Sequence, residues 1–242
     1  MYEDWAMRKF KAAIVASALL GLTVALGACA SDPVEPDVET SQSPDAGVDA
    51  PQAHAAWLDE GRLIGLVTYG SSTCVPVAEV AVAEEDVLTV IFAEEEEGAA
   101  CTRDMVPRVT LVPVPEDADV LSDLNIVVAE TDITAQLSAL AEAPASEMTD
   151  YEPSAGWYDD QGGFVLLTWG SSTCVPAIES VEATGDADVA VVFAALPADQ
   201  PCTLDMAPRA MAVQVDGLAS QVDVTLLLSG AEITGTTVIM AN

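Results

Sequence analysis

The sequence predicts an all-β protein with two tandem homologous modules, each a small antiparallel sandwich or barrel with one disulfide. Short Val- and Ile-rich runs alternate with turn residues, a long block of sequence recurs about 100 residues later, and each block holds two cysteines. The expected order is a signal peptide (1–28), a linker (29–56), module 1 (57–140), a second linker (141–156) and module 2 (157–242).

The N-terminal segment has the pattern of a secretory signal. A basic stretch, Met7–Lys11, precedes an apolar run, Ala12–Ala28, and we expect translation to start at Met7. The run ends in Leu-Gly-Ala-Cys, which resembles the lipobox of bacterial lipoproteins. That resemblance implies cleavage before Cys29, lipidation of its thiol and an anchor on the extracytoplasmic face of the membrane. A plain membrane-spanning helix is the alternative.

The chain that follows the signal is strongly acidic. Removing residues 1–28 takes away three of the seven basic residues and two of the 40 acids, which leaves four arginines, no lysine, 38 acids and a formal charge of −34. Such a surface repels nucleic acid, so no nucleic-acid partner is expected. The charge favours solubility, with weak divalent-cation binding or a basic partner as alternatives.

Residues 30–56 are rich in Pro, Ala, Ser and acids, a composition typical of a disordered tether. This linker holds the only histidine, His54. Without His or Lys, the modules offer no Ser–His pair, ordinary zinc site or Schiff base, so we predict no catalytic residues, metal or cofactor. An acid-pair hydrolase is a less favoured alternative, because carboxylates such as Asp59, Glu79, Asp104 and Asp123 recur in both copies.

Five strands are expected in each copy, and the second copy gains one residue after Glu179. They span 62–69, 79–84, 87–93, 108–114 and 124–130 in module 1, and 163–169, 177–183, 188–194, 209–215 and 221–228 in module 2. We also expect a helical turn at 133–140, and one more strand in the tail at 235–242 that could join the other module's edge. The modules either lie apart or pack as a pseudo-twofold pair.

Two cysteines remain in each copy after Cys29 is assigned to the lipid. An even number outside the cytoplasm predicts disulfides, and the duplication favours pairing within each copy. The predicted bridges are Cys74–Cys101 and Cys174–Cys202. Each closes a loop that the chain-entropy model values at about 3.6 kcal/mol.

Two repeated motifs surround these cysteines. Gly-Ser-Ser-Thr-Cys-Val-Pro is predicted to form a disulfide corner, because it lacks the pattern of a nucleophile elbow. Cys-Thr-x-Asp-Met-x-Pro-Arg keeps an arginine in both copies, and an Arg–Asp pair that ties the turn is the favoured interpretation. The alternative is recognition of a carboxylate or phosphate. The residues concerned in either case are Arg108, Arg209, Asp104, Asp205, Ser71, Ser72, Ser171 and Ser172.

Two further features have structural and functional interpretations. The acidic run at 93–98 occurs in module 1 alone, which favours a solvated loop over a loose Ca²⁺ site. Trp57 and Trp157 stand at the start of each copy and are expected to fill the core rather than to stack on a ligand.

The combination of the two motifs with the strand pair between them resembles a module of secreted or lipid-anchored proteins from high-GC Gram-positive bacteria. The resemblance covers both copies, and it implies location and architecture but no active site. We therefore expect an envelope lipoprotein whose modules bind an envelope protein or glycan, with a passive acidic surface protein as the alternative.

Overall fold

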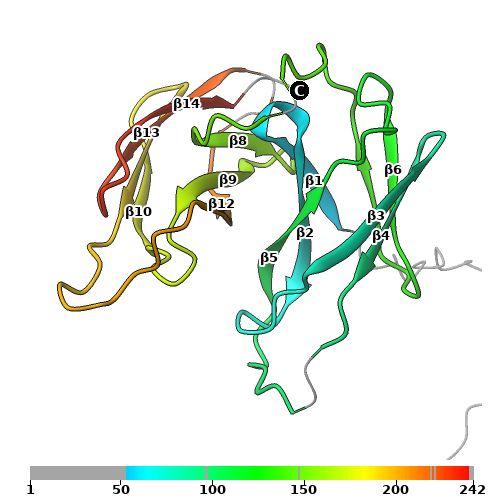
Figure 1. Cartoon of the computed structure of the whole chain (residues 1–242). Helices are drawn as coiled ribbons and strands as arrows, with labels where there is room; N and C mark the ends of the chain where they lie inside the picture. Colours follow the sequence, from blue (N-terminus) through cyan, green and yellow to red (C-terminus); the bar gives the residue numbers. More distant parts are fainter. Residues whose placement is uncertain (1–52, 96–97, 147, 219, 221, 240–242) are drawn as a thin grey trace, which may run out of the picture. The chain divides into compact units, whose positions relative to one another are not determined.

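The computed structural model describes residues 53–242 except 96–97, 147, 219, 221 and 240–242, so the predicted signal peptide, Cys29 and nearly all of the tether lie outside the described residues. The described part is all-β: it holds fourteen strands and a single 3₁₀ turn, Asp59–Gly61 (Figure 1). None of its helices is long and apolar enough to span a bilayer. The prediction of two tandem β modules, each with one disulfide, is confirmed.

Module 1 contains seven strands in two sheets. One sheet has the order β1 (His54–Leu58), β2 (Leu63–Gly70), β5 (Val106–Pro113), and the other β3 (Ala78–Glu84), β4 (Val87–Phe92), β6 (Leu124–Val128), β7 (Thr134–Leu137). All five predicted strands form. The predicted helical turn at 133–140 is wrong, because Thr134–Leu137 is a strand with alternating burial that pairs with β6. The end of the predicted linker also forms a strand, β1, which contains His54.

Module 2 repeats this arrangement. Its sheets are β8 (Ser154–Trp157), β9 (Gly163–Gly170), β12 (Ala207–Gln214), and β10 (Ile178–Ala183), β11 (Asp188–Phe193), β13 (Val224–Ser229), β14 (Gly235–Ile239). The tail strand β14 pairs with β13 of its own module, not with the other module's edge. The extra residue of this copy lies in the β10–β11 turn, since Val80 pairs with Ile91 in module 1 and Ser180 with Val192 in module 2.

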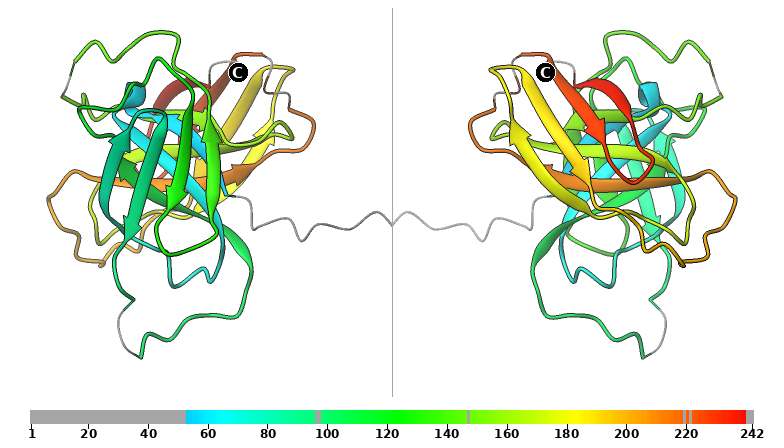
Figure 2. Two further views of the ribbon diagram at one scale, coloured as in Figure 1. Left: turned by 90° about the vertical axis from the view of Figure 1, so that its right-hand side faces the viewer. Right: turned by 90° about the vertical axis from the view of Figure 1, so that its left-hand side faces the viewer.

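Each four-stranded sheet is mixed rather than wholly antiparallel. Strand β4 runs parallel to β6, and β11 runs parallel to β13. The chain between the two parallel strands crosses to the three-stranded sheet as β5 or β12, which supplies the crossover that parallel neighbours require. The four-stranded sheet of module 1 faces the viewer in the left view of Figure 2, and that of module 2 in the right view.

The three-stranded sheets are buried on both faces. On β2, Ile64 and Leu66 join the core between the two sheets of module 1, whereas the next residue, Val67, joins a separate cluster with residues of module 2. Strand β9 divides its side chains in the same way. Burial on both faces explains why β2 and β9 have nearly continuous apolar sequences instead of an alternating pattern.

The modules pack against each other through these sheets. The shared apolar cluster consists of Ala56, Leu58, Val67, Tyr158, Val165 and Leu167, with partly buried neighbours around it. Strand β1 contacts β8, and β5 contacts β12, so equivalent strands meet as a pseudo-twofold arrangement requires. A Cβ on Gly156 would lie 2.4 Å from the carbonyl oxygen of Trp57, so the close approach of β8 to β1 requires glycine there.

A polar clamp fixes the linker between the modules to module 1. Asp59, 4% exposed, accepts two hydrogen bonds from Arg62, at 2.9 and 3.0 Å, and one from Thr149 of the linker at 2.9 Å. Arg62 also donates to the carbonyl of Ser146, and the Asp59 amide donates to Ser154 at the start of β8. The bonds from Arg62 and Thr149 lower the pKa of Asp59 despite its burial, which acts in the opposite direction.

Candidate functional site

Each disulfide joins two loops at one end of its module. Cys74 and Cys101 are bonded, as are Cys174 and Cys202, with Cα atoms 5.4 Å apart in both bridges. The predicted pairing is therefore confirmed. We call the joined segments the pinned loops: residues 71–77 with 98–105 in module 1, and 171–177 with 194–206 in module 2.

The hydroxyl groups of the pinned loops form a compact cluster. In module 1, Ser71 Oγ and Thr102 Oγ1 are 2.8 Å apart, and Thr73 Oγ1 accepts from the amide of Thr102 at 3.1 Å. Asp104 accepts from the amide of Ser72 at 3.1 Å and from the hydroxyl of Thr102. These bonds satisfy backbone groups in a segment that forms no strand.

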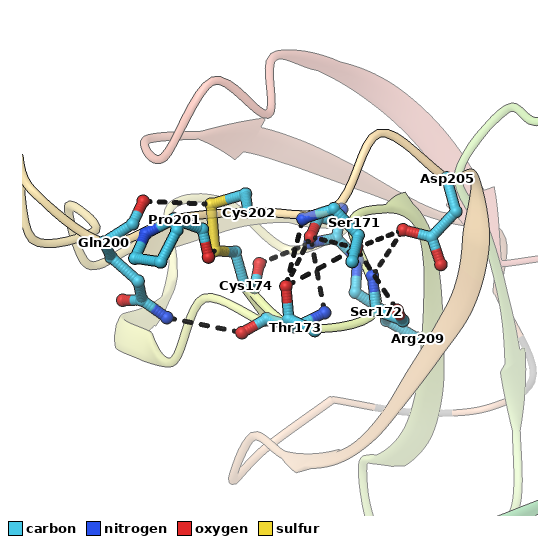
Figure 3. Close-up of a disulfide and its surroundings, with 10 residues drawn as sticks. Ser171, Ser172, Thr173, Cys174, Gln200, Pro201, Cys202, Asp205 and Arg209 are labelled. Carbon is cyan, nitrogen blue, oxygen red and sulfur yellow. Dashed lines mark hydrogen bonds between the residues drawn. A yellow bond between two sulfur atoms is a disulfide. The ribbon is translucent and has the colours of Figure 1, made fainter.

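Module 2 repeats the main bonds of this cluster (Figure 3). Ser171 Oγ lies 2.8 Å from Thr203 Oγ1, Thr173 accepts from the Thr203 amide at 3.0 Å, and Asp205 accepts from the Ser172 amide at 3.1 Å. The predicted residues Ser71, Ser72 and Asp104, and their counterparts, are thus brought together in each copy. Their bonds are mostly to one another, so the cluster holds the loops together.

The two carboxylates of the clusters are strongly acidic. Hydrogen bonds from Ser72 and Thr102 lower the pKa of Asp104 to about 2, and bonds from Thr203 and Ser172 lower the pKa of Asp205 to about 2. A carboxylate with so low a pKa is a weak base, so neither is suited to take a proton from a neighbouring hydroxyl at neutral pH. This chemistry favours positioning over general-base catalysis.

The favoured interpretation of the arginines is correct only in part: each arginine ties the turn through charge-assisted bonds to backbone carbonyls, but neither lies within ion-pair distance of the nearby aspartate. Within the described residues, the ion pairs are those of Arg62 with Asp59 and Glu60. Arg108 instead donates to the carbonyl oxygen of Cys74 at 2.5 Å and to Thr68 Oγ1 at 3.3 Å. Asp104 lies two residues before β5 begins, and its carboxylate bonds to Ser72 and Thr102 instead.

Arg209 has the same role in module 2. It donates to the carbonyl oxygens of Cys174 at 3.0 Å and of Trp169 at 2.5 Å. Its guanidinium packs on Gly170, where a Cβ would lie 2.0 Å from Nη2, and Gly70 has the same relation to Arg108. The repeated glycine and the repeated arginine are therefore parts of one structure, in which the guanidinium replaces backbone partners for the Ser-rich loop.

The pinned loops carry exposed apolar side chains beside the hydroxyl clusters. Thr102 and Asp104 bond within the cluster, and Met105 next to them is 74% exposed. In module 2, Leu204 is fully exposed and Met206 is half exposed. Further exposed apolar residues of these loops are Val75, Val77 and Val175. Large apolar side chains held in water on two equivalent loops are a candidate binding surface.

The remaining candidate features have structural roles or show no assembled site. Trp157 is buried in the core of module 2, and Trp57 packs on the core of module 1 and donates to the Ser138 carbonyl at 2.7 Å, so the core interpretation holds. Glu94 and Glu95 of the acidic run are exposed, and Glu96 and Glu97 lie outside the described residues. No cluster of three metal-binding side chains occurs in the part of the chain that the structure describes.

Comparison with known proteins gives no further guide to the site, because no family model, curated protein or solved structure matches this chain. The sequence interpretation missed the exposed Met105, Met206 and Leu204. Their positions beside the Thr and Asp of the repeated Cys-Thr-x-Asp-Met motif are the signal that could have revealed them.

Proposed function

We propose that this protein is an extracytoplasmic lipoprotein, anchored through Cys29, whose pinned loops bind a partner at the cell envelope. The observation that carries the proposal is the repeated display of exposed apolar side chains on loops that a disulfide, a hydroxyl cluster and an arginine hold in place. Order in the unbound loops reduces the entropy lost on binding, which favours a binding role.

The rest of the chain supports this proposal. The lipobox-like end of the signal accounts for the anchor, and the tether provides reach from the membrane. The disulfides are compatible with an oxidising compartment. The acidic charge disfavours a partner with a strongly negative surface and favours a neutral or basic one.

The experiment is capture from solubilised cell envelope with the oxidised chain 30–242 as bait. A second bait carries Met105→Ser, Leu204→Ser and Met206→Ser, which removes apolar surface from both modules without touching the clusters. We expect at least one protein or glycan to be enriched by the first bait and depleted at least tenfold with the second.

A matched control separates binding at the loops from general hydrophobic adhesion. Leu121→Ser and Leu227→Ser change exposed apolar residues outside the pinned loops, and capture should survive them. Equal capture by the loop variant and the parent bait, or no enrichment over an acidic protein of similar charge, would refute the proposal.

A further inference from the structure

The outer strand of the four-stranded sheet differs between the two modules. Strand β3 is the edge of its sheet in module 1, and β10 is the equivalent edge in module 2. An edge strand presents backbone N–H and C=O groups to a further strand, and soluble proteins commonly block such edges with charged side chains. In the described part of the chain, no backbone hydrogen bond outside the β3–β4 ladder involves residues 78–84.

Both edges carry two glutamates and a β-bulge, but they differ at the two central outward positions. The outward positions of β10 carry Ser180 and Glu182, paired with Val192 and Ala190 of β11. The equivalent positions of β3 carry Val80 and Val82, each 43% exposed, and Val80 pairs with Ile91, which is 40% exposed. Two homologous edges in one molecule therefore differ at the positions that permit or prevent strand addition.

We propose that β3 pairs antiparallel with β3 of a second copy of this chain. The sequence Val80-Ala81-Val82 is symmetric about Ala81, so a register centred there places Val80 of one copy opposite Val82 of the other. In the same register Glu84 lies opposite Ala78, and Glu79, which lies at the β-bulge of β3, is nearest to Ala83. No acid therefore faces an acid across the new ladder, where like charges would destabilise it. The two sheets would then join into one, with four valines and two Ile91 side chains on a continuous outer face.

The strength of this association is set by opposing terms. A single strand pair with three apolar side chains per copy is at the small end of protein interfaces, so a dissociation constant on the order of 100 µM is expected. The net negative charge of each copy opposes contact, and salt screens that repulsion. Salt should therefore strengthen the dimer, whereas it would weaken the binding of a basic peptide to the same edge.

Sedimentation velocity on the chain 30–242 tests the proposal at two salt concentrations. Roughly 20 mM NaCl leaves the repulsion between the acidic copies largely unscreened, and roughly 500 mM NaCl screens most of it. We expect concentration-dependent dimers that increase with salt. The double variant Val80→Ser, Val82→Glu carries the residues that module 2 has at the equivalent positions, so the fold should tolerate both changes. This variant should remain a monomer at both salt concentrations. Leu227→Ser, at an exposed apolar site outside this edge, should dimerise like the parent.

Cross-linking tests the register separately. A chain with Val80→Cys mixed with a chain with Val82→Cys should form an intermolecular disulfide faster than either chain alone, because these positions face each other. A parent chain that stays monomeric to about 1 mM, tenfold above the expected constant, would overturn the proposal, and so would a dimer that persists in the Val80→Ser, Val82→Glu variant. Faster cross-linking within a single variant would overturn the register. This inference is independent of the pinned loops, whose variants should dimerise normally.

Discussion

Replacing Arg108 with Met tests whether the guanidinium holds the Ser-rich loop through neutral acceptors. Met keeps much of the apolar stem but removes the donors to the Cys74 carbonyl and to Thr68. A hydrogen bond from a charged donor contributes about 1.5–3 kcal/mol, and partial exposure places these two bonds near the lower limit. We therefore expect the free energy of unfolding to fall by about 2–4 kcal/mol.

Urea denaturation followed by tryptophan fluorescence and circular dichroism measures this loss. Because the acceptors are uncharged, the difference between parent and variant should stay nearly constant when salt rises from about 0.05 to 0.5 M, whereas an exposed ion pair would be screened. A loss below about 0.5 kcal/mol, within the range of ordinary surface substitutions, would refute the structural role of Arg108. A loss that disappears at high salt would restore the ion-pair interpretation.

Three further predictions concern the same loops. Cys174→Ser with Cys202→Ser should lower the free energy of unfolding by about 3–4 kcal/mol, the value for a loop of this length, and an unchanged urea midpoint would contradict it. Gly170→Ala should destabilise module 2, because φ is +154° and the new Cβ meets Arg209; the cost, measured by thermal unfolding, should shrink when Arg209→Met is also present. The depressed pKa of Asp104 and Asp205 contributes stability that is present above the ordinary value near 3.8 and is lost as pH falls through about 2, so NMR titration of these carboxyl groups should give midpoints near 2, and midpoints near 4 would contradict the cluster.

The strands that the sequence predicts are those with an intrinsic apolar pattern. The runs at 62–69 and 163–169 are Val- and Leu-rich over a full strand length, so composition alone identifies β2 and β9. Strand β7 has four residues, and β1 begins in Ala-rich sequence that continues the tether, so both depend on partners supplied by the tertiary fold. The parallel pairing of β4 with β6 is likewise a property of topology, which no local pattern contains.

The candidate site shows the same division. The disulfide pairing followed from duplication, because a duplicated unit that folds by itself pairs its two cysteines within each copy. The role of Arg108 did not follow, because a spacing of four residues suggests proximity only on a helix, and this segment is extended. Its acceptors are backbone carbonyls more than 30 positions away along the chain, and a carbonyl has no sequence identity by which it could be recognised.

Differences between the two copies are as informative as their agreement. The pinned loops share their disulfide, the core of their hydroxyl cluster and the bond from the arginine to the Cys carbonyl in both modules, as expected for a structure that each copy needs by itself. The clamp is particular to module 1: Arg62 occupies the place that Gly162 has in module 2, and it binds the linker between the two modules. The outward valines of the β3 edge are a second such difference. Because β10 shows that Ser and Glu fit these positions of the fold, folding of the module alone does not explain Val80 and Val82, which agrees with the proposed pairing of β3 with a second copy.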